Sequence, residues 1–206
     1  MNTLTGNIMF PPLLRNFVEL MEQSLRFVTM FQPIPCLTFI MQFLCHHVRY
    51  ASQIWALCDN TTTHRIQILQ NTAIRLMTFN GPRVPATPLL ANFELLNVFD
   101  QVKVMNITYL HKYFNANLPA ESLQSLKFEK TQHPTETRDK FIELIFRPNV
   151  NTTNFGLNSF TRISSNQWNE LQRNHIDIKL SEIEVKELKS LSFKFYLGRY
   201  ANVTHT

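Results

Sequence analysis

Cysteine and histidine residues gather in the first third of the chain, where they could in principle hold a metal ion. Cys45, His46 and His47 are consecutive, and Cys58 and His64 follow. Thiolate and imidazole are the usual zinc ligands, but this spacing fits no closed zinc-finger pattern. Adjacent histidines on a helix point about 100° apart, so at most one of the pair could share a face with Cys45. We therefore expect no metal ion and no other cofactor.

Carboxylates are spaced too widely in the sequence to suggest two-metal catalysis, in which acidic side chains hold ions about 3.5–4 Å apart. Four aspartates occur singly, each at a position where a helix cap or a turn commonly uses this residue: Asp59, Asp100, Asp139 and Asp177. The sequence also lacks the glycine-rich phosphate loops and the serine-nucleophile motif, and it has only 4 glycines. We expect no catalytic residue and no small-molecule ligand.

The composition favours a folded, mainly α-helical chain with an anionic partner. Of 206 residues, 44% are hydrophobic, and 17 Phe against 4 Gly favour packed helices. The net charge of +5 favours a polyanion such as nucleic acid. Three cysteines and the lack of a secretion signal favour an intracellular setting, in the cytoplasm or nucleus. The most apolar run, residues 34–45, contains Pro35 and Gln42 and falls short of the roughly 20 residues that span a membrane, so we expect no membrane partner.

The element that would position basic side chains most clearly is an amphipathic helix over residues 64–79. Its apolar residues fall on one face, which contains Ile66, Leu69, Ala73, Leu76 and Met77. Arg65 and Arg75 lie at the edges of this stripe, and Gln67 lies on the polar face. Prolines follow from residue 82 onward, so the helix should end near Asn80.

Further helices are predicted on both sides of this one. We expect an N-terminal segment (1–35) with a helix after Pro12, an interior helix over about 36–55, a short helical turn at 88–96, and a helix over 101–114 capped by Asn97 or Asp100. In the helix over 101–114, Val102, Met105, Tyr109 and Tyr113 would line one side, and Lys103 and Lys112 would lie elsewhere.

Periodicity weakens over residues 121–167, which favours short strands and loops. A final amphipathic helix would start at Ser181, whose hydroxyl forms a capping box with Glu184. It would turn Leu188, Leu191 and Phe195 to the core and leave its lysines outside. The chain then divides into a segment 1–35, a helical bundle 36–119 and a tail 120–206 with a terminal helix.

Several segments, taken in order, resemble the region that follows the palm in reverse transcriptases of non-LTR (LINE-type, jockey-like) retrotransposons. Residues 49–55 are similar to the family's R-Y-x-x-Q-I-W, and residues 65–75 are similar to its R-I-x-x-L-Q-x-x-A-I-R. The later matches are Pro85–Leu89, the helix ending in Asn117-Leu118-Pro119, His133 with Thr137-Arg138, and Gly156–Ser159 leading to W-N-x-L at 168–171. The resemblance covers about residues 47–197, while residues 19–38 depart from the pattern.

The resemblance implies a thumb-like helical region and tail of an RNA-directed DNA polymerase, without the palm and its paired aspartates. Such a segment would not polymerise alone, since the parent enzyme would use Mg²⁺ in the missing palm. It would contact the template and primer through phosphates, and the candidate residues are Arg49, His64, Arg65, Arg75, Lys103 and Lys112.

A different interpretation is a small helical protein-interaction module without a nucleic-acid role. A fragment cut from a larger enzyme exposes the apolar surface that met its neighbour, and that surface could serve an interface. Basic residues gathered on one face would favour the first interpretation. A broad apolar face rimmed by charge would favour the second.

Overall fold

The computed structural model describes residues 60–118 and 160–201, together with Glu19, Gln23, His46, Phe128 and Ile145. Within these ranges the chain forms helices and no strand, which confirms the predicted mainly α fold. The helices are α4 (Asn60–Met77), α5 (Ala86–Asn92), α6 (Val98–Phe114), α9 (Phe160–Asn174) and α10 (Val185–Ala201). The helices predicted before residue 60, the strands predicted between 121 and 159, and most of the two outer segments lie outside the described residues.

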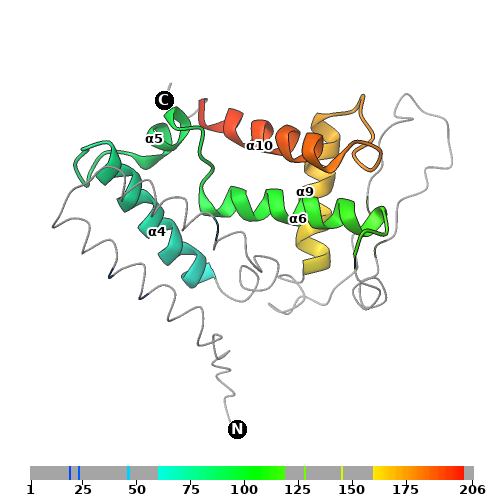
Figure 1. Cartoon of the computed structure of the whole chain (residues 1–206), viewed down its shortest axis with the longest axis horizontal. Helices are drawn as coiled ribbons and strands as arrows, with labels where there is room; N and C mark the ends of the chain where they lie inside the picture. Colours follow the sequence, from blue (N-terminus) through cyan, green and yellow to red (C-terminus); the bar gives the residue numbers. More distant parts are fainter. Residues whose placement is uncertain are drawn as a thin grey trace, which may run out of the picture.

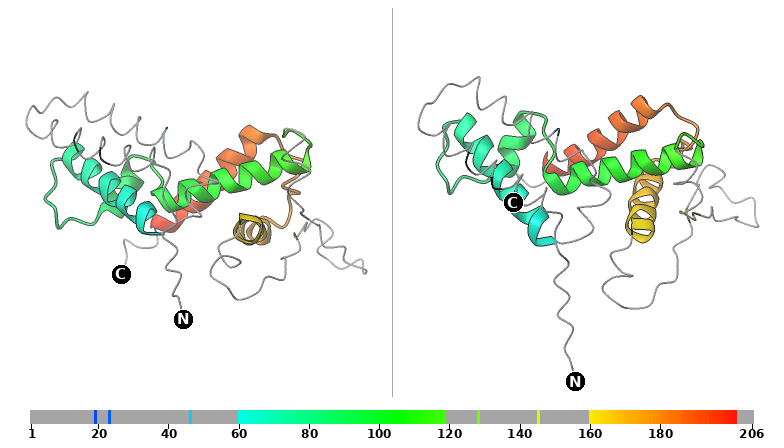
Figure 2. Two further views of the ribbon diagram at one scale, coloured as in Figure 1. Left: turned by 90° about the horizontal axis from the view of Figure 1, so that it is seen from below. Right: turned by 60° about the horizontal axis from the view of Figure 1, so that its bottom comes forward.

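Helix α6 lies at the centre of the described part (Figures 1 and 2). α10 packs along it, α9 crosses it, and α4 and α5 lie at its N-terminal end, with α5 also touching α10. The main core is built where α6, α9 and α10 meet, from fully buried side chains that include Ile107, Leu110, Trp168, Leu171, Leu188 and Tyr196. A smaller cluster of Ile74, Ala86 and Leu90 joins α4 to α5.

The most buried residues of α6 are not those of its predicted apolar side. Ile107 and Leu110 are completely buried, whereas Met105, Tyr109 and Tyr113 are only half-buried. The predicted side does pack within the bundle, since Val102 is buried and Met105 contacts the main core, but the most buried residues lie on another side of the helix. Other helices cover α6 on more than one side, so burial does not follow a single apolar stripe.

The apolar stripe of α4 is confirmed at Ile66, Leu69 and Ala73, but its predicted polar face is not free. Gln67 is only 8% exposed, and its Oε1 accepts a hydrogen bond from the backbone N–H of Val98 at 2.7 Å. Gln70 is fully buried and donates to the carbonyl of Leu96 at 2.9 Å. The prediction that Gln67 lies on a polar face was wrong, because the backbone before α6 packs against it and needs partners.

Three helices end with a residue other than glycine in the left-handed conformation. The residues are Phe79 after α4, Glu94 after α5 and Ala116 after α6, with φ of 54°, 51° and 53°. Each belongs to a Schellman motif, in which the next residue donates back to a carbonyl of the last turn. These bonds run from Asn80 to Arg75, from Leu95 to Leu90 and from Asn117 to Lys112. The predicted end of the first of these helices near Asn80 is confirmed.

α6 begins at Val98, three residues before its predicted start. Asn97 is its N-cap, since the side-chain oxygen of Asn97 accepts from the backbone N–H of Asp100 at 2.7 Å. Of the two predicted caps, Asn97 is the right one. Asp100 lies inside the first turn of the helix.

α10 begins at Val185, so the predicted helix start at Ser181 was wrong. The first helical bond runs from the N–H of Leu188 to the carbonyl of Glu184. The preceding carbonyls bond instead to the end of α6: Asn115 donates to Ser181 at 3.1 Å, and His111 donates to Ile183 at 2.8 Å. These tertiary bonds hold residues 181–183 in a turn, so the helix begins only after them.

Residues 160–167, predicted as strand or loop, form the first half of α9. This stretch is rich in serine and threonine, which blurs its helical period. The hydroxyl of Ser165 bonds to the carbonyl of Thr161 at 2.6 Å, one turn earlier. Trp168 and Leu171, both completely buried, hold the helix against the core.

Candidate nucleic-acid interface

The basic residues predicted on α4 have different surroundings. His64 and Arg65 are exposed. Arg75 is half-buried at the other end of the helix, where its Nε donates to the carbonyl of Val84 at 2.7 Å. Arg75 therefore closes the loop that follows α4, and part of its guanidinium is engaged within the fold.

The candidates on α6 also differ from each other. The Nζ of Lys103 lies 2.7 Å from Oδ1 of Asp100 and 5.0 Å from the centre of the Tyr196 ring. Lys112 is exposed near the C-terminal end of the helix. Arg49, the remaining candidate, lies outside the described residues. Lys103 thus has an internal role, while Lys112 remains available at the surface.

Asp100, predicted as an ordinary cap, is the centre of a buried polar group. Its Oδ2 accepts from the hydroxyl of Tyr200 at 2.8 Å and from the side-chain amide of Asn97 at 2.9 Å. The hydroxyl of Tyr200 in turn accepts from the N–H of Asn97 at 2.9 Å. Burial raises the pKa of Tyr200 above its usual value, and Asp100 adds to the increase, so the hydroxyl stays protonated and keeps donating. The end of α10 is tied in this way to the start of α6.

The described candidates do not form one cluster. α4 meets the N-terminal end of α6, where Gln67 contacts Val98. Lys112 lies fourteen residues after Val98, which places it about 21 Å farther along the helix axis. A ligand touching both Arg65 and Lys112 would have to extend along the bundle.

Sequence reasoning did not select the basic face of α10. Lys186, Lys189 and Lys194 are exposed there, as their predicted position outside the core implies. The side-chain ammonium groups of Lys189 and Lys194 have no hydrogen bond or ion pair with any residue in the described ranges. The signal for this face was present in the lysine spacing of the last helix, but such a pattern is also that of an ordinary solvated face.

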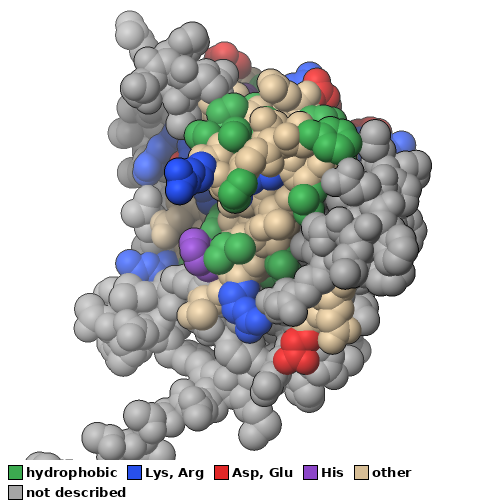
Figure 3. All heavy atoms as spheres, turned by 90° about the vertical axis from the view of Figure 1, so that its left-hand side faces the viewer, with side chains coloured by type: hydrophobic (Ala, Val, Ile, Leu, Met, Phe, Trp, Pro, Cys, Tyr) green, Lys and Arg blue, Asp and Glu red, His purple; other side chains and the backbone are tan. Residues whose placement is uncertain are grey.

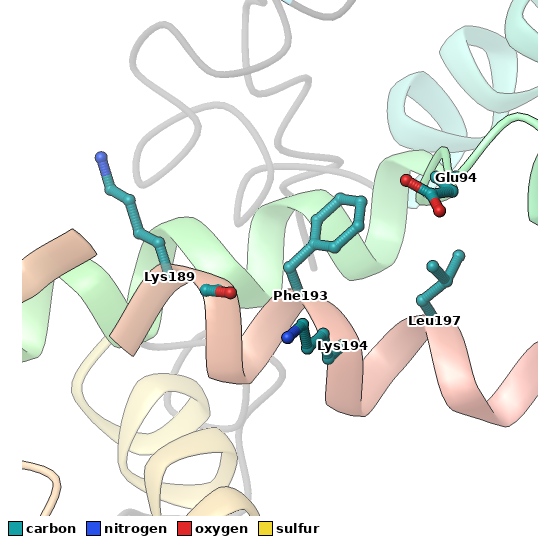
Figure 4. A pocket seen from close by; sticks show the side chains of 6 residues that line it. Glu94, Lys189, Phe193, Lys194 and Leu197 are labelled. Carbon is teal, nitrogen blue, oxygen red and sulfur yellow. The ribbon is translucent and has the colours of Figure 1, made fainter. Parts of the chain in front are cut away.

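A groove of about 420 Å³ runs beside two of these lysines (Figure 4). α10 supplies Lys189, Ser190, Phe193, Lys194 and Leu197, and Glu94 comes from the end of α5. Phe193 and Leu197 are half-buried, with one side of each packed on the main core. The groove therefore has an apolar floor and charged walls.

Polar residues of the quoted motifs have structural partners. In the W-N-x-L segment, Asn169 accepts from the N–H of Ile145 at 2.8 Å and donates to its carbonyl at 3.0 Å. Gln172 donates to the carbonyls of His175 and Ile178 and accepts from the N–H of Leu180, which organises the turn after α9. Together with Gln70 and Arg75 on α4, these residues connect helices and loops of the bundle.

No three His, Cys, Asp or Glu side chains among the described residues are grouped so that they could hold a metal ion. The cysteines of the Cys/His group lie outside the described residues. Nor does any described helix combine the length and apolar character needed to cross a membrane.

Comparison with known proteins identifies no relative. No family model matches the chain, and no curated protein or solved structure matches it significantly.

Proposed function

We propose that this chain binds nucleic acid, as the post-palm region of an RNA-directed DNA polymerase from a non-LTR mobile element. In the parent enzyme it would help to hold the template and primer beside the palm. It would not be catalytic alone, because the carboxylates that hold two metal ions belong to the palm. The origin rests on the ordered motifs, whose residues in α4 and α9 have the bundle-building roles described above.

The exposed lysines of α10 carry the binding part of the proposal. This helix has Lys186, Lys189, Lys194 and Arg199, but only Glu187 among acidic residues. Arg199 pairs with Glu170 at 2.6 Å, while the three lysines are exposed to solvent. Unpaired surface lysines attract phosphates and release counterions when they bind. Exposed Arg65 and Lys112 add positive charge elsewhere on the same bundle.

Binding of a labelled mixed-sequence strand at a series of salt concentrations tests this function. We expect weak, largely sequence-independent binding that falls linearly with salt on logarithmic axes, because phosphate contacts dominate. Arg65→Gln should reduce the slope by about one, as expected for a lost phosphate contact. Arg173→Gln, which removes an exposed charge at the end of α9, is the matched control. Binding that is absent at low salt would refute the proposal.

A protein-interaction module remains the second candidate, because some large apolar side chains are exposed. Phe79 and Phe93 are 67% and 48% exposed, at the ends of α4 and α5. Figure 3 faces this end of the molecule and shows hydrophobic side chains in separate groups, with polar and basic side chains between them. This arrangement differs from a broad apolar face rimmed by charge. Concentration-dependent self-association that Phe79→Ser abolishes would favour the second candidate.

A further inference from the structure

The side-chain charges that line the groove beside α10 differ from one end to the other. Figure 4 shows Lys189 at one end, Phe193 and Lys194 in the middle, and Leu197 with Glu94 at the other end. Lys189 and Leu197 are eight residues apart on the helix, or about 12 Å along its axis. The groove thus has one lysine at an end, an apolar floor with a second lysine in the middle, and a carboxylate at the far end.

We infer that this groove binds one nucleotide of a single strand, an inference that rests on the proposed nucleic-acid function. Lys189 and Lys194 contact the phosphate, and the base lies against the exposed side of Phe193. Aromatic side chains provide such stacking surfaces in proteins that bind single strands. The carboxylate of Glu94 then accepts from an amino group on the base edge, as acidic residues do with cytosine.

The charges favour a nucleotide over other anionic occupants. An acidic peptide or an anionic membrane would place negative charge along the whole groove, and Glu94 would repel it. A nucleotide has negative charge at the phosphate only and hydrogen-bond donors on its base. A duplex keeps its bases stacked inside the helix, so it could use the lysines but not Phe193. The inference therefore predicts a preference for single strands.

Fluorescence anisotropy of the full chain with labelled oligocytidine, alone or paired with oligoguanosine, tests the inference. We expect tighter binding to the single strand than to the duplex. Phe193→Leu should weaken single-strand binding about tenfold and leave duplex binding nearly unchanged, because it removes stacking and keeps an apolar side chain. Lys189→Gln with Lys194→Gln should weaken binding to both. The matched control is Arg83→Gln with Arg173→Gln, which removes the same charge at exposed positions outside the groove and outside α10.

The possible outcomes distinguish the groove assignment from the proposed nucleic-acid binding of the whole chain. Salt-dependent binding that neither groove variant changes, or that the control pair weakens as much as the groove pair, would overturn the groove assignment and leave nucleic-acid binding in place. No binding by the parent chain would overturn both. Circular dichroism of each variant checks folding. The lysine pair is exposed, so the test stands even if Phe193→Leu unfolds.

Discussion

Replacing Tyr200 with phenylalanine should destabilise the fold by about 2–4 kcal/mol, since it removes one oxygen atom that serves two hydrogen bonds. The Tyr200 hydroxyl donates to the buried carboxylate of Asp100 at 2.8 Å and accepts from the N–H of Asn97 at 2.9 Å. A hydrogen bond to a charged group contributes about 1.5–3 kcal/mol, and a donor left without a partner costs about 1–3 kcal/mol. Asp100 keeps its bonds to Lys103 and Asn97, so the sum is reduced.

Urea denaturation followed by circular dichroism measures this change in the free energy of unfolding directly. In thermal melting, the Tm should fall by roughly 4–16 °C for a chain of this size. Tyr109→Phe is the matched control, because the Tyr109 hydroxyl has no hydrogen bond within the described ranges and its ring contacts Phe160 edge-on at 5.4 Å. If Tyr200→Phe were as stable as Tyr109→Phe, the tie between α6 and α10 would contribute nothing and the reasoning would fail.

The pH dependence of this tie follows from the pKa of Tyr200, which burial raises above its usual value. A tyrosine whose native pKa exceeds that of the unfolded chain stabilises the fold fully below about pH 10 and loses this contribution as pH rises further. The difference in unfolding free energy between the parent and Tyr200→Phe should therefore stay constant at neutral and mildly alkaline pH, and should shrink above about pH 10. Urea titrations at several pH values check this.

Three further predictions concern the core of α4 and the missing chemistry. Leu69→Ala should leave a cavity and cost about 2–5 kcal/mol in urea denaturation, and parental stability would exclude Leu69 from the core. Gln67→Ala should cost about 1–3 kcal/mol, because the buried N–H of Val98 loses its acceptor; Thr72→Ala, at an exposed position of the same helix, is the control. If the proposed origin is right, the purified chain should extend no primer on an RNA template with Mg²⁺ or Mn²⁺, because the metal-binding carboxylates of such a polymerase belong to its palm, and extension above a mock preparation would contradict this.

The parts of the fold that depend on local pattern could be predicted from the sequence. The apolar spacing of Ile66 and Ala73 predicted the buried side of α4, and the prolines after Gly81 predicted its end. The buried roles of Gln67 and Gln70 could not be predicted, because their partners are backbone groups near Leu96, far along the chain. The start of α10 was missed for the same reason, since side chains of α6 hold the turn before it.

The candidate site likewise has some features that could be predicted from the sequence and others that could not. The lysines of α10 were correctly predicted to lie outside the core, and Arg65, predicted at the edge of the apolar stripe, is exposed. The sequence could not show that α5 brings Glu94 beside α10 to form a groove. The spacing of Asp100 and Lys103 on one helix allows an ion pair, but the sequence could not show that Tyr196 and Tyr200 of α10 lie against it. Such features appear only when separate helices pack together.

The three helix ends in the left-handed conformation are strained, so glycine substitutions at these positions should raise the free energy of unfolding. A side chain in this conformation costs about 1–2 kcal/mol relative to glycine, which adopts it without steric conflict. Phe79, Glu94 and Ala116 are all exposed, so glycine at these positions would remove strain without removing core contacts. A chain with only 4 glycines has left this route to a more stable fold unused, and glycine in place of Phe79 and Ala116 would take it while keeping the carboxylate of Glu94 in the groove.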